Sequence, residues 1–406
     1  MTRDVFSDGN RIKFTAMDHP SQANAFLRNL FDLVKKRGYS EVFIDCADVG
    51  RAFPNVIVPV TGIIDFYRTT EHVEFEFPQL PDFLSRSHFA QPMNVASNEK
   101  RLKSNPLNIV WKFQTAEDVN DLGNEFVRAI SQEIVCEEGV IDSIMWCINE
   151  VMDNVMLHSG KDYGFVMGQV HKQTRHISFC VYDNGQGIHN SLKNSAHSPK
   201  TSIEAIEMAI QERVTRDKAV GQGNGMWGLS EIVKNNSGRL SIASGSGLFF
   251  RSNGNLETRD DLAFLSPDNG ACSVDFQLNY NQKVMLAVAL KGHKPVNYRT
   301  ENFEDDQGVI VYRLADMPSG TGTRQSGQKI RNDVINLYGD SKKGVVIDFD
   351  GLSVISSSFA DELVGKLVVH FGFFGFNQIV RLKNMNTLIQ AIVERSVTQR
   401  MAESFT

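Results

Sequence analysis

The sequence predicts an α/β protein with more than one domain. Its 406 residues are 41% hydrophobic, and at ~100–200 residues per domain this length allows about two to four domains. Stretches with helical periodicity alternate with short apolar stretches along the chain, which is the order typical of α/β folds. The 22% of charged residues, 31 glycines and 11 prolines exclude a disordered or collagen-like chain.

Charge and cysteine content narrow the class further. Forty-two Lys and Arg against 48 Asp and Glu give a formal net charge of -6, so binding to nucleic acid is not indicated. The five cysteines form no C-x-x-C pair, which favours free thiols in a reducing compartment. No apolar run suits a membrane-spanning helix, and the first ten residues do not resemble a signal peptide. We therefore expect a cytoplasmic protein that does not enter a membrane.

The first region, residues 1–88, is predicted to be a small α/β domain. Its patterns alternate in the order amphipathic helix 25–36, strand EVFID 41–45, helix 60–68 and alternating strand HVEFEF 72–77. Residues 89–105 are polar and irregular, and we expect them to form a linker.

The middle region, about 106–292, begins with long helical patterns and continues with strands. The expected elements are helices near 117–135, 136–160 and 202–214, strands 163–171 and 176–183, helix 229–236, and strands 239–244 and 271–278. The apolar stretch VMLAVAL at 284–290 is expected to be a buried strand.

The last region follows an acidic stretch at 301–308. Its expected elements are strand 308–314, helix 329–339, strand 344–349, helix 356–372 and strand 378–382. We therefore predict three domains, with boundaries at 1–88, 89–292 and 293–406. VFIDCADV at 42–49 and VVIDFDGL at 345–352 share a V-x-I-D pattern, which suggests that the outer domains are an internal repeat, although any buried strand that ends in Asp would look similar.

One segment of the middle region places three polar side chains at intervals of four residues: Glu150, Asn154 and His158. Residues four apart share one face of a helix. The opposite face is apolar and can pack on a sheet; it consists of Ile144, Ile148, Val151 and Val155. The pattern predicts a helix that presents a carboxylate, an amide and an imidazole together, although an ordinary solvated face would look the same.

A second segment joins a strand end to two glycines. Asp183 ends an apolar strand, and Gly185 and Gly187 follow it. Glycine permits positive φ and a close approach of the backbone to a flat ligand. A carboxylate at this strand end can accept a hydrogen bond from an exocyclic amine, although the same pattern alone also fits an ordinary turn.

A third segment is a glycine-rich loop before the helix at 229–236. It contains Gly221, Gly223, Gly225 and Gly228. Such a loop at a helix N-terminus presents backbone N–H groups to phosphate oxygens. No Gly-Lys-Ser/Thr follows, so the loop is not a Walker A loop.

In this order and spacing, the three segments resemble the GHKL superfamily of ATP-binding domains, which includes type II topoisomerases, MutL proteins, histidine kinases and anti-sigma-factor serine kinases. The resemblance covers about residues 117–280 and implies a Bergerat fold, a two-layer α/β sandwich that binds ATP and Mg²⁺. On this resemblance Glu150 and Asn154 belong to the N-box, Asp183, Gly185 and Gly187 to the G1 box, and Gly221, Gly223, Gly225 and Gly228 to the G2 box.

The resemblance also implies roles for these residues. Asn154 would ligate Mg²⁺ through its amide oxygen, and Glu150 would act as general base. Asp183 would accept a hydrogen bond from the adenine amino group. Arg216 and Lys218, beside the glycine-rich loop, are candidates for contact with the γ-phosphate.

Two departures from the family pattern concern the loop and the late strand. Met226 and Trp227 separate Gly225 from Gly228, where histidine kinases usually have G-x-G-L-G-L. Gly270-Ala271 stands where a Gly-Thr pair is common in the family. These departures leave the hydrolysis rate and the geometry of the loop open.

The C-terminal region resembles a STAS-like domain, the fold of anti-anti-sigma factors. The resemblance rests on GVVIDF, LSVISSS and FADELVGKL within residues 344–367. Ser357 is the closest match to the serine that partner kinases phosphorylate in that family. Ser356 and Phe359 replace the Asp and Gly of the family motif, so the serines could instead cap the helix. The N-terminal region is expected to be a second, divergent STAS-like domain, with Phe53-Pro54-Asn55 in the corresponding loop.

The upstream segment 116–147 contains no histidine, which argues against autophosphorylation on histidine. The fold expected is thus a central GHKL sandwich between two small STAS-like domains. The leading functional prediction is an ATP- and Mg²⁺-dependent regulatory switch, or a serine kinase of the anti-sigma type, with a protein partner or a second copy of the chain. An ATPase whose dimer closes on ATP, as in MutL proteins, and a non-catalytic ATP-sensing scaffold are the alternatives.

Overall fold

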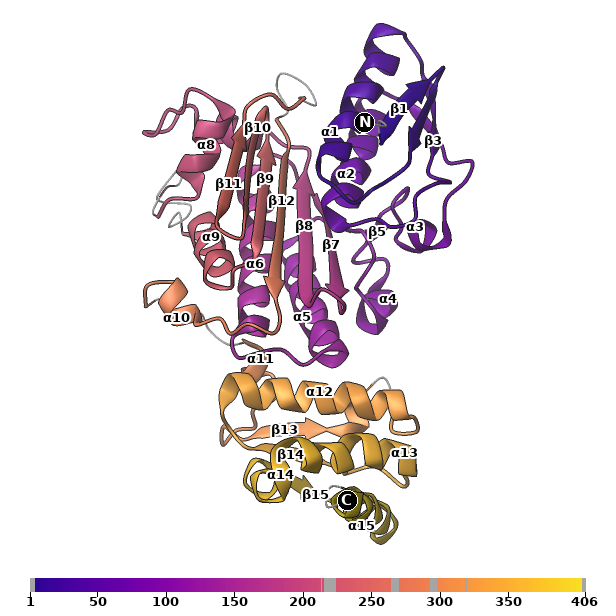
Figure 1. Ribbon diagram of the computed structural model, residues 1–406, viewed down its shortest axis with the longest axis vertical. Coiled ribbons are helices and arrows are strands. Elements are labelled where there is room, and N and C mark those ends of the chain that lie inside the picture. The colour runs from indigo at the N-terminus through magenta and orange to yellow at the C-terminus, as the bar shows by residue number, and fades with distance from the viewer. Residues whose placement is uncertain are drawn as a thin grey trace. The chain divides into compact units, whose positions relative to one another are not determined.

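The computed structural model of the protein describes residues 4–212, 214, 224–263, 270–292, 298–317 and 320–403. The chain forms two compact units (Figure 1). The first unit consists of Met1–Phe126, Met145–Asn279 and Val288–Lys291, and the second of Val127–Ile144, Tyr280–Ala287 and Gly292–Thr406. Three sheets are present among the described residues, and helices alternate with their strands, which confirms the α/β prediction. The predicted boundaries of three domains stay predictions.

The N-terminal part of the first unit contains a four-stranded sheet. Its strands are β1 (Val5–Asp8), β2 (Arg11–Phe14), β3 (Glu41–Asp45) and β4 (Glu74–Glu76), in that order across the sheet. β1 and β2 are antiparallel, and β2, β3 and β4 are parallel. The helices are α1 (Ser21–Phe31), which continues as the π-helical turn η1 (Asp32–Lys36), and α2 (Pro54–Thr70).

Helix α2 begins earlier than the sequence pattern suggested. The prediction that Phe53-Pro54-Asn55 forms a loop is wrong for the last two residues, because α2 starts at Pro54. A proline fits the first helical turn, where its fixed φ is suitable and its missing N–H costs nothing. Twelve of the 17 residues of α2 are buried, so this helix has almost no solvated face.

Residues 89–105 are not a linker. They contain β5 (Met93–Asn94), which pairs in parallel with β6 (Trp111–Phe113), and α4 (Glu99–Ser104). The side chains of Phe89 and Leu102 are buried, so the segment belongs to the core despite its polar composition. A short helix, α3 (Asp82–Arg86), precedes it.

The largest sheet has eight strands in the order β11-β10-β9-β12-β8-β7-β6-β5. Its remaining strands are β7 (Gly164–His171), β8 (His176–Asp183), β9 (Arg239–Ser244), β10 (Gly247–Ser252), β11 (Asn255–Arg259) and β12 (Cys272–Asn279). The helices of this region are α5 (Ala116–Glu133), α6 (Val140–His158), α7 (Gly187–Leu192), α8 (Ser202–Ala209) and α9 (Gly225–Asn235). All pairings from β6 to β11 are antiparallel, so alternate residues of each strand face opposite sides of the sheet.

Helices cover both faces of this sheet (Figure 1). On one face the ring of Phe126 in α5 meets that of Phe179 in β8 edge to face, with centroids 5.1 Å apart. The predicted apolar side of α6 is buried as expected, with Ile144 and Ile148 fully covered. On the other face α2 lies so close to β8 that a Cβ at Gly62 would stand 2.2 Å from the ring of Tyr182.

The apolar stretch at 284–290 is not a strand. It contains the short helix α10 (Leu286–Ala289), and Met285 and Val288 are 65% and 59% exposed. Periodicity cannot separate a short apolar strand from a short helix, and this segment pairs with none of the described strands.

The C-terminal part of the second unit contains a parallel sheet in the order β13-β14-β15. Its strands are β13 (Ile310–Arg313), β14 (Val345–Asp348) and β15 (Val380–Lys383). Its helices are α11 (Tyr298–Glu301), the 3₁₀ turn η2 (Leu314–Asp316), α12 (Arg324–Ser341), α13 (Ser357–Ala360), the π-helical turn η3 (Asp361–Gly365), α14 (Lys366–Ile379) and α15 (Thr387–Glu403). The elements β13, β14, α12 and α14 share one hydrophobic core.

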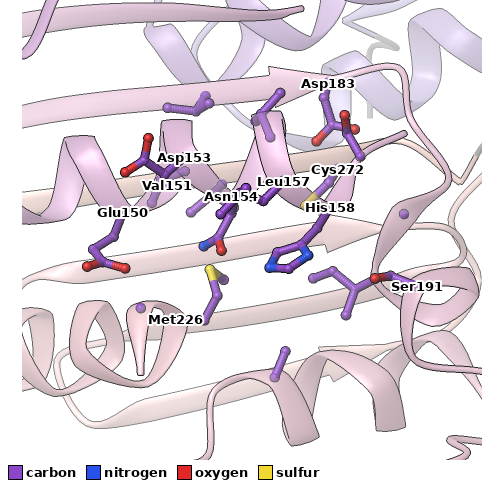
Figure 2. Close-up of a pocket in the computed structure, with 18 of the residues that line it drawn as sticks. Glu150, Val151, Asp153, Asn154, Leu157, His158, Asp183, Ser191, Met226 and Cys272 are labelled. Carbon is purple, nitrogen blue, oxygen red and sulfur yellow. The ribbon is translucent and has the colours of Figure 1, made fainter. Parts of the chain in front are cut away.

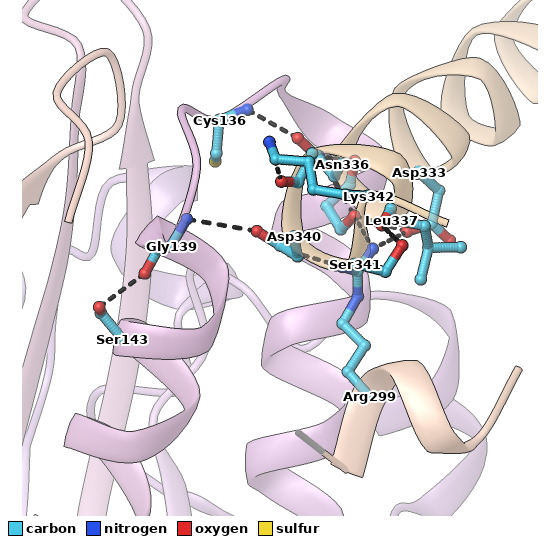
Figure 3. Close-up of polar contacts among 12 residues, drawn as sticks. Cys136, Gly139, Ser143, Arg299, Asp333, Asn336, Leu337, Asp340, Ser341 and Lys342 are labelled. Atoms are coloured by element: carbon cyan, nitrogen blue, oxygen red, sulfur yellow. Dashed lines mark hydrogen bonds and ion pairs between the residues drawn. The ribbon is translucent and has the colours of Figure 1, made fainter. Parts of the chain in front are cut away.

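A buried polar network joins α12 to the end of α5 within the second unit (Figure 3). Arg299, 8% exposed, donates to Asp333 at 2.6 Å and to Asp340 at 3.0 Å. The Asn336 amide accepts from the Cys136 backbone N–H at 2.8 Å and donates to the Ser131 carbonyl at 3.0 Å. Charged and amide groups at this depth are satisfied by one another, so each depends on its partners.

Candidate functional site

Residues from all three segments with candidate functional side chains line one cavity of the first unit (Figure 2). The cavity has a volume of about 380 Å³ and lies between α6, α7, α9 and the strands β8 and β12. Its lining includes Glu150, Asp153, Asn154, His158, Asp183, Gly187, Ile188, Ser191, Leu192, Asn224, Gly225, Met226, Cys272 and Val274. Residues that lie up to 124 positions apart in the sequence, from Glu150 to Val274, therefore line one cavity.

Helix α6 presents the polar stripe that its spacing predicted. Glu150, Asn154 and His158 all line the cavity, while Ile148 on the opposite side is buried in the core. The amide nitrogen Nδ2 of Asn154 is buried and has no hydrogen-bond partner among the described residues. An orphan buried donor is costly, so the site favours a ligand that supplies an acceptor at this point.

Glu150 lies where α9 begins. A Cβ at Gly225 would stand 2.3 Å from the Glu150 Oε2 atom, so only glycine lets the start of α9 approach this carboxylate. Burial raises the pKa of Glu150 to about 7, and the nearby charge of Asp153 adds to the rise. A carboxyl with a pKa near neutrality suits a general base, because it is partly ionised at working pH and still accepts a proton readily.

Asp183 is the last residue of β8, and only 5% of it is exposed. Its Oδ1 accepts the backbone N–H of Gly185 at 2.8 Å. Burial raises the pKa of Asp183 to about 7, and the Gly185 hydrogen bond opposes that rise. A carboxyl held this way can accept one more hydrogen bond from a group inside the cavity.

The two glycines after Asp183 are needed for different reasons. Gly187 has φ of +76°, a left-handed conformation that glycine adopts without strain. Gly185 has no such φ, but a Cβ there would lie 2.3 Å from the Ser159 carbonyl oxygen. The turn is fixed further because the Gly185 carbonyl accepts the Ala271 N–H at 3.0 Å. The Gly270-Ala271 pair, which departs from the family pattern, is thus part of the wall beside Asp183.

The glycine-rich segment is described only in part. Gly221 and Gly223 lie outside the described residues, as do Arg216 and Lys218. Gly225 is the first residue of α9. Gly228 packs against α6, since a Cβ there would stand 2.2 Å from the Trp146 ring. Thus Gly228 supports the wall of the site and does not itself line the cavity.

The described lining carries three acidic groups and one imidazole, that of His158, but no Lys or Arg. Glu150, Asp153 and Asp183 contribute three carboxyls, and partial burial raises the pKa of Asp153 as well. No group of three or more His, Cys, Asp or Glu that could hold a metal ion occurs among the described residues. A cation bound here would therefore need most of its ligands from the molecule it arrives with.

The sequence did not predict the residues on the wall of this cavity that is formed by β12 and α7. Cys272 pairs with Asp183 across the β8–β12 ladder, and its side chain lines the cavity with that of Val274. Ser191 and Leu192 of α7 complete this side. No local pattern identifies these residues, because their place depends on the register between two strands that lie far apart in the sequence.

The serine loop of the C-terminal region caps a helix. Ser356 is the N-cap of α13, and its Oγ accepts the Phe359 N–H at 3.0 Å. Ser357 is exposed at the first helical position. The capping interpretation is confirmed for Ser356, and phosphorylation of Ser357 stays a prediction.

None of the helices described is both long and apolar enough to cross a membrane.

Comparison with known proteins gives one family match and several distant likenesses to solved structures, of which two follow. The solved structure described as mycobacterial sensor histidine kinase MprB has a TM-score of 0.24 and 16% identity, over 41% of this chain and 95% of that chain. The full-length ShkA structure in complex with AMPPNP has a TM-score of 0.23 and 10% identity, over 70% of this chain and 55% of that chain. Both TM-scores are too low to support an argument about this chain.

The sequence has no significant match among curated proteins. Residues 326–390 match the family described as a STAS-like domain of unknown function (DUF4325). This segment runs from the start of α12 into α15, so it contains β14, β15 and the serine loop. The C-terminal region of the protein therefore contains a STAS-like domain, as its sequence predicted.

Proposed function

We propose that the protein is an ATP-binding regulatory protein whose nucleotide site is the cavity around Glu150, Asn154 and Asp183. One observation carries the proposal: the three segments that resemble GHKL motifs supply side chains to the same cavity of about 380 Å³. That size lies within the ~300–1,000 Å³ range of small-molecule pockets. The STAS-like domain supplies the regulatory part of the proposal.

The residues present fit a nucleotide. Asp183 holds a buried carboxyl in a wall that also includes Gly187 and Val274, which suits a flat base with an amino group. At the other side, Asn154 offers its orphan Nδ2 donor and α9 begins at Gly225. Backbone N–H groups at the start of an 11-residue helix favour phosphate oxygens.

Magnesium fits the site only as a partner of the phosphates. Asn154 is the residue that would hold it, through the amide oxygen, and the absence of a three-ligand cluster among the described residues leaves the other positions to phosphate and water. When bound, the ion would neutralise phosphate charge, which matters beside the carboxyls of Glu150, Asp153 and Asp183.

Glu150 is the residue proposed to take the proton. Its carboxylate lies beside Gly225, the first residue of α9, and one helical turn before Asn154, where it would orient a water molecule or a substrate hydroxyl. If the acceptor is water the protein is an ATPase, and if it is a serine hydroxyl the protein is a kinase of the anti-sigma type. Ser357 of the STAS-like domain is the exposed hydroxyl whose modification the kinase version predicts first.

The proposed switch uses helix α6. Its first turn, from Val140, belongs to the unit that contains the STAS-like domain, and its later turns contribute Glu150 and Asn154 to the cavity. A change in the helix on nucleotide binding would alter the surface that the STAS-like domain offers to a protein partner or a second copy.

The test is incubation of the full chain with Mg²⁺ and γ-labelled ATP, followed by separation of protein from free phosphate. Label on the protein identifies a kinase, and free phosphate together with a change in oligomeric state identifies the ATPase with dimer closure. Equilibrium binding without turnover identifies a sensor. If labelled ATP shows no saturable binding, the proposed function is wrong.

Two substitutions separate the proposed roles. Glu150→Ala should keep ATP binding and lose turnover or transfer, because the proton acceptor is gone. Asn154→Ala should make ATP binding insensitive to Mg²⁺, measured by titration with and without EDTA. Glu117→Ala, at an exposed position in the first turn of α5, is the matched control and should behave as the wild type. Wild-type turnover in Glu150→Ala would remove Glu150 from the role of base.

A further inference from the structure

A second cavity lies on the opposite face of the eight-stranded sheet. It has a volume of about 260 Å³ and is formed by α1 and α2 on one side and by β9, β10 and β12 on the other. Ser273 and Asp275 of β12 face it, whereas the alternate residues Cys272 and Val274 face the first cavity. The two cavities are therefore separated by the thickness of the sheet.

Two buried oxygen atoms of residues that line this cavity accept no hydrogen bond within the described structure. Asp275 is 5% exposed, and its Oδ1 atom is buried without a hydrogen-bond partner among the described residues. Asn55 of α2 lines the cavity as well, and its Oδ1 atom is equally buried and unpartnered. Buried oxygen atoms without a hydrogen bond are rare in folded proteins, because each one costs free energy. Both atoms therefore favour a ligand that donates hydrogen bonds.

Two of the charged residues that line the cavity, Asp18 and Arg259, are already neutralised by ion pairs. Asp18 is paired with Arg51, and Arg259 is paired with Asp261 through two hydrogen bonds.

The charged lining residues with no ion pair in the described structure are Arg239, Glu257 and Asp275. Two carboxylates against one guanidinium leave the cavity with a formal surplus of one negative charge. Arg239 is exposed at the start of β9 and donates no hydrogen bond to Oδ1 of Asp275, although its charge favours the ionised form of that carboxyl and opposes the rise of its pKa that burial causes.

The remaining lining is apolar. Leu27, Ile63 and Leu248 contribute side chains from α1, α2 and β10. A compact body with a planar donor group at one end matches this combination, because apolar surface buries the body while the carboxylate takes two N–H donors.

We infer that this cavity is a binding site for a small organic cation with an amidinium or guanidinium group, held by the carboxylate of Asp275 and the amide oxygen of Asn55. The site is separate from the proposed nucleotide site and does not depend on it. It would make the helix α2 and the outer face of the sheet respond to a metabolite of this class.

The test uses benzamidine, which has a planar amidinium on an apolar ring, titrated into the full chain and followed by ligand-observed NMR. Asp275→Asn removes the charge and presents an N–H in place of an acceptor, and should weaken binding about tenfold or more. Ala243→Phe leaves the carboxylate in place and fills the cavity from β9, where Ala243 is part of the lining, and should abolish binding.

Three controls make the result decisive. Asp82→Asn changes an exposed carboxyl, 97% accessible, and should leave binding unchanged. Asp183→Asn, in the first cavity, should also leave benzamidine binding unchanged, which separates this site from the nucleotide site. Circular dichroism of each variant confirms that it is folded. The inference requires saturable binding to the wild type and loss in both Asp275→Asn and Ala243→Phe; no binding to the wild type, or retention in either variant, overturns it.

Discussion

The N-terminal and C-terminal α/β regions share a local design. In each, the strand with the V-x-I-D pattern is the middle of three parallel strands: β3 in β2-β3-β4 and β14 in β13-β14-β15. In each, the terminal aspartate accepts the backbone N–H two residues on, Asp45 from Ala47 at 3.1 Å and Asp348 from Asp350 at 3.0 Å. The repeat suggested by eight residues is therefore matched by strand position and turn geometry.

The two regions differ in how their principal helices are buried. Helix α2 packs on the eight-stranded sheet mainly through apolar residues, with Gly62 against Tyr182 at the closest point. Helix α12 instead buries polar residues, Asn332, Asp333 and Asn336 among them, which are met by Arg299 and by the backbone at the end of α5. Apolar packing is sensitive to volume, whereas a buried polar network is sensitive to charge and to the loss of any one partner.

The largest expected effect is in the polar network. Arg299→Met leaves Asp333 and Asp340 without their cation, and removal of one partner of a buried ion pair costs ~3–5 kcal/mol. We expect the second unit of Arg299→Met to unfold at a lower urea concentration than that of the wild type. Limited proteolysis with mass spectrometry at increasing urea concentrations measures this. Arg313→Met, at an exposed position on β13, is the control and should have little effect. Equal stability of the two variants would show that the network contributes nothing.

A smaller effect is expected in the apolar packing of α2. A Cβ at Gly62 would meet the Tyr182 ring at 2.2 Å, so Gly62→Ala should destabilise the first unit by ~1–3 kcal/mol through overpacking. The matched substitution is Gly339→Ala in α12, where a Cβ meets nothing within 4 Å. That change should stabilise its helix by ~0.5–1 kcal/mol. Thermal unfolding of both variants compares the two regions directly, and destabilisation by Gly339→Ala would contradict the geometry.

The smallest expected effect is the response of the polar network to pH. Burial and the nearby Asp142 raise the pKa of Asp340 to about 7, against the opposing pull of Arg299. A carboxyl with a raised pKa binds its proton more tightly in the folded state, so its contribution to stability is lost as pH rises from about 4 through about 7. Asp340→Asn has no such proton to lose. As pH rises from 5.5 to 8, its free energy of unfolding should therefore increase relative to that of the wild type by on the order of 1 kcal/mol.

The measurement is urea denaturation of the Asp340→Asn and wild-type proteins at both pH values. Asp348→Asn is the control, because this carboxyl ends β14 outside the Arg299 network and accepts hydrogen bonds from the Asp350 backbone and the Asn384 amide. A stability difference between Asp340→Asn and wild type that does not change with pH would show that Asp340 does not titrate in this range.

Local patterns predicted which side chains of α6 and of the end of β8 line the first cavity, but they could not predict the residues of its opposite wall. The four-residue spacing placed Glu150, Asn154 and His158 on one helix face, because helical geometry is set by neighbouring residues. Asp183 was identifiable since it ends an apolar strand before two glycines. Cys272 was not, because its place depends on the pairing of β12 with β8.

Elements were predicted well where periodicity was strong and poorly where burial came from distant contacts. The strand at 41–45 and the strand at 176–183 were predicted with their observed bounds. The supposed linker at 89–105 is ordered because Phe89 and Leu102 enter the core, which a polar composition conceals. The stretch at 284–290 was assigned as a strand on hydrophobicity alone, although Met285 is exposed.

The central claim, that the cavity around Asp183 binds ATP, is tested most directly by thermal unfolding of the full chain with and without ATP and Mg²⁺. At 100 times its dissociation constant a ligand stabilises the folded state by about 2.7 kcal/mol, which gives a clear rise of the unfolding temperature. The account predicts this rise for the wild type and for Asp82→Asn, and its loss in Asp183→Asn, because the amide can present an N–H to the adenine amino group. An equal rise in Asp183→Asn, or no rise in the wild type, would contradict the claim.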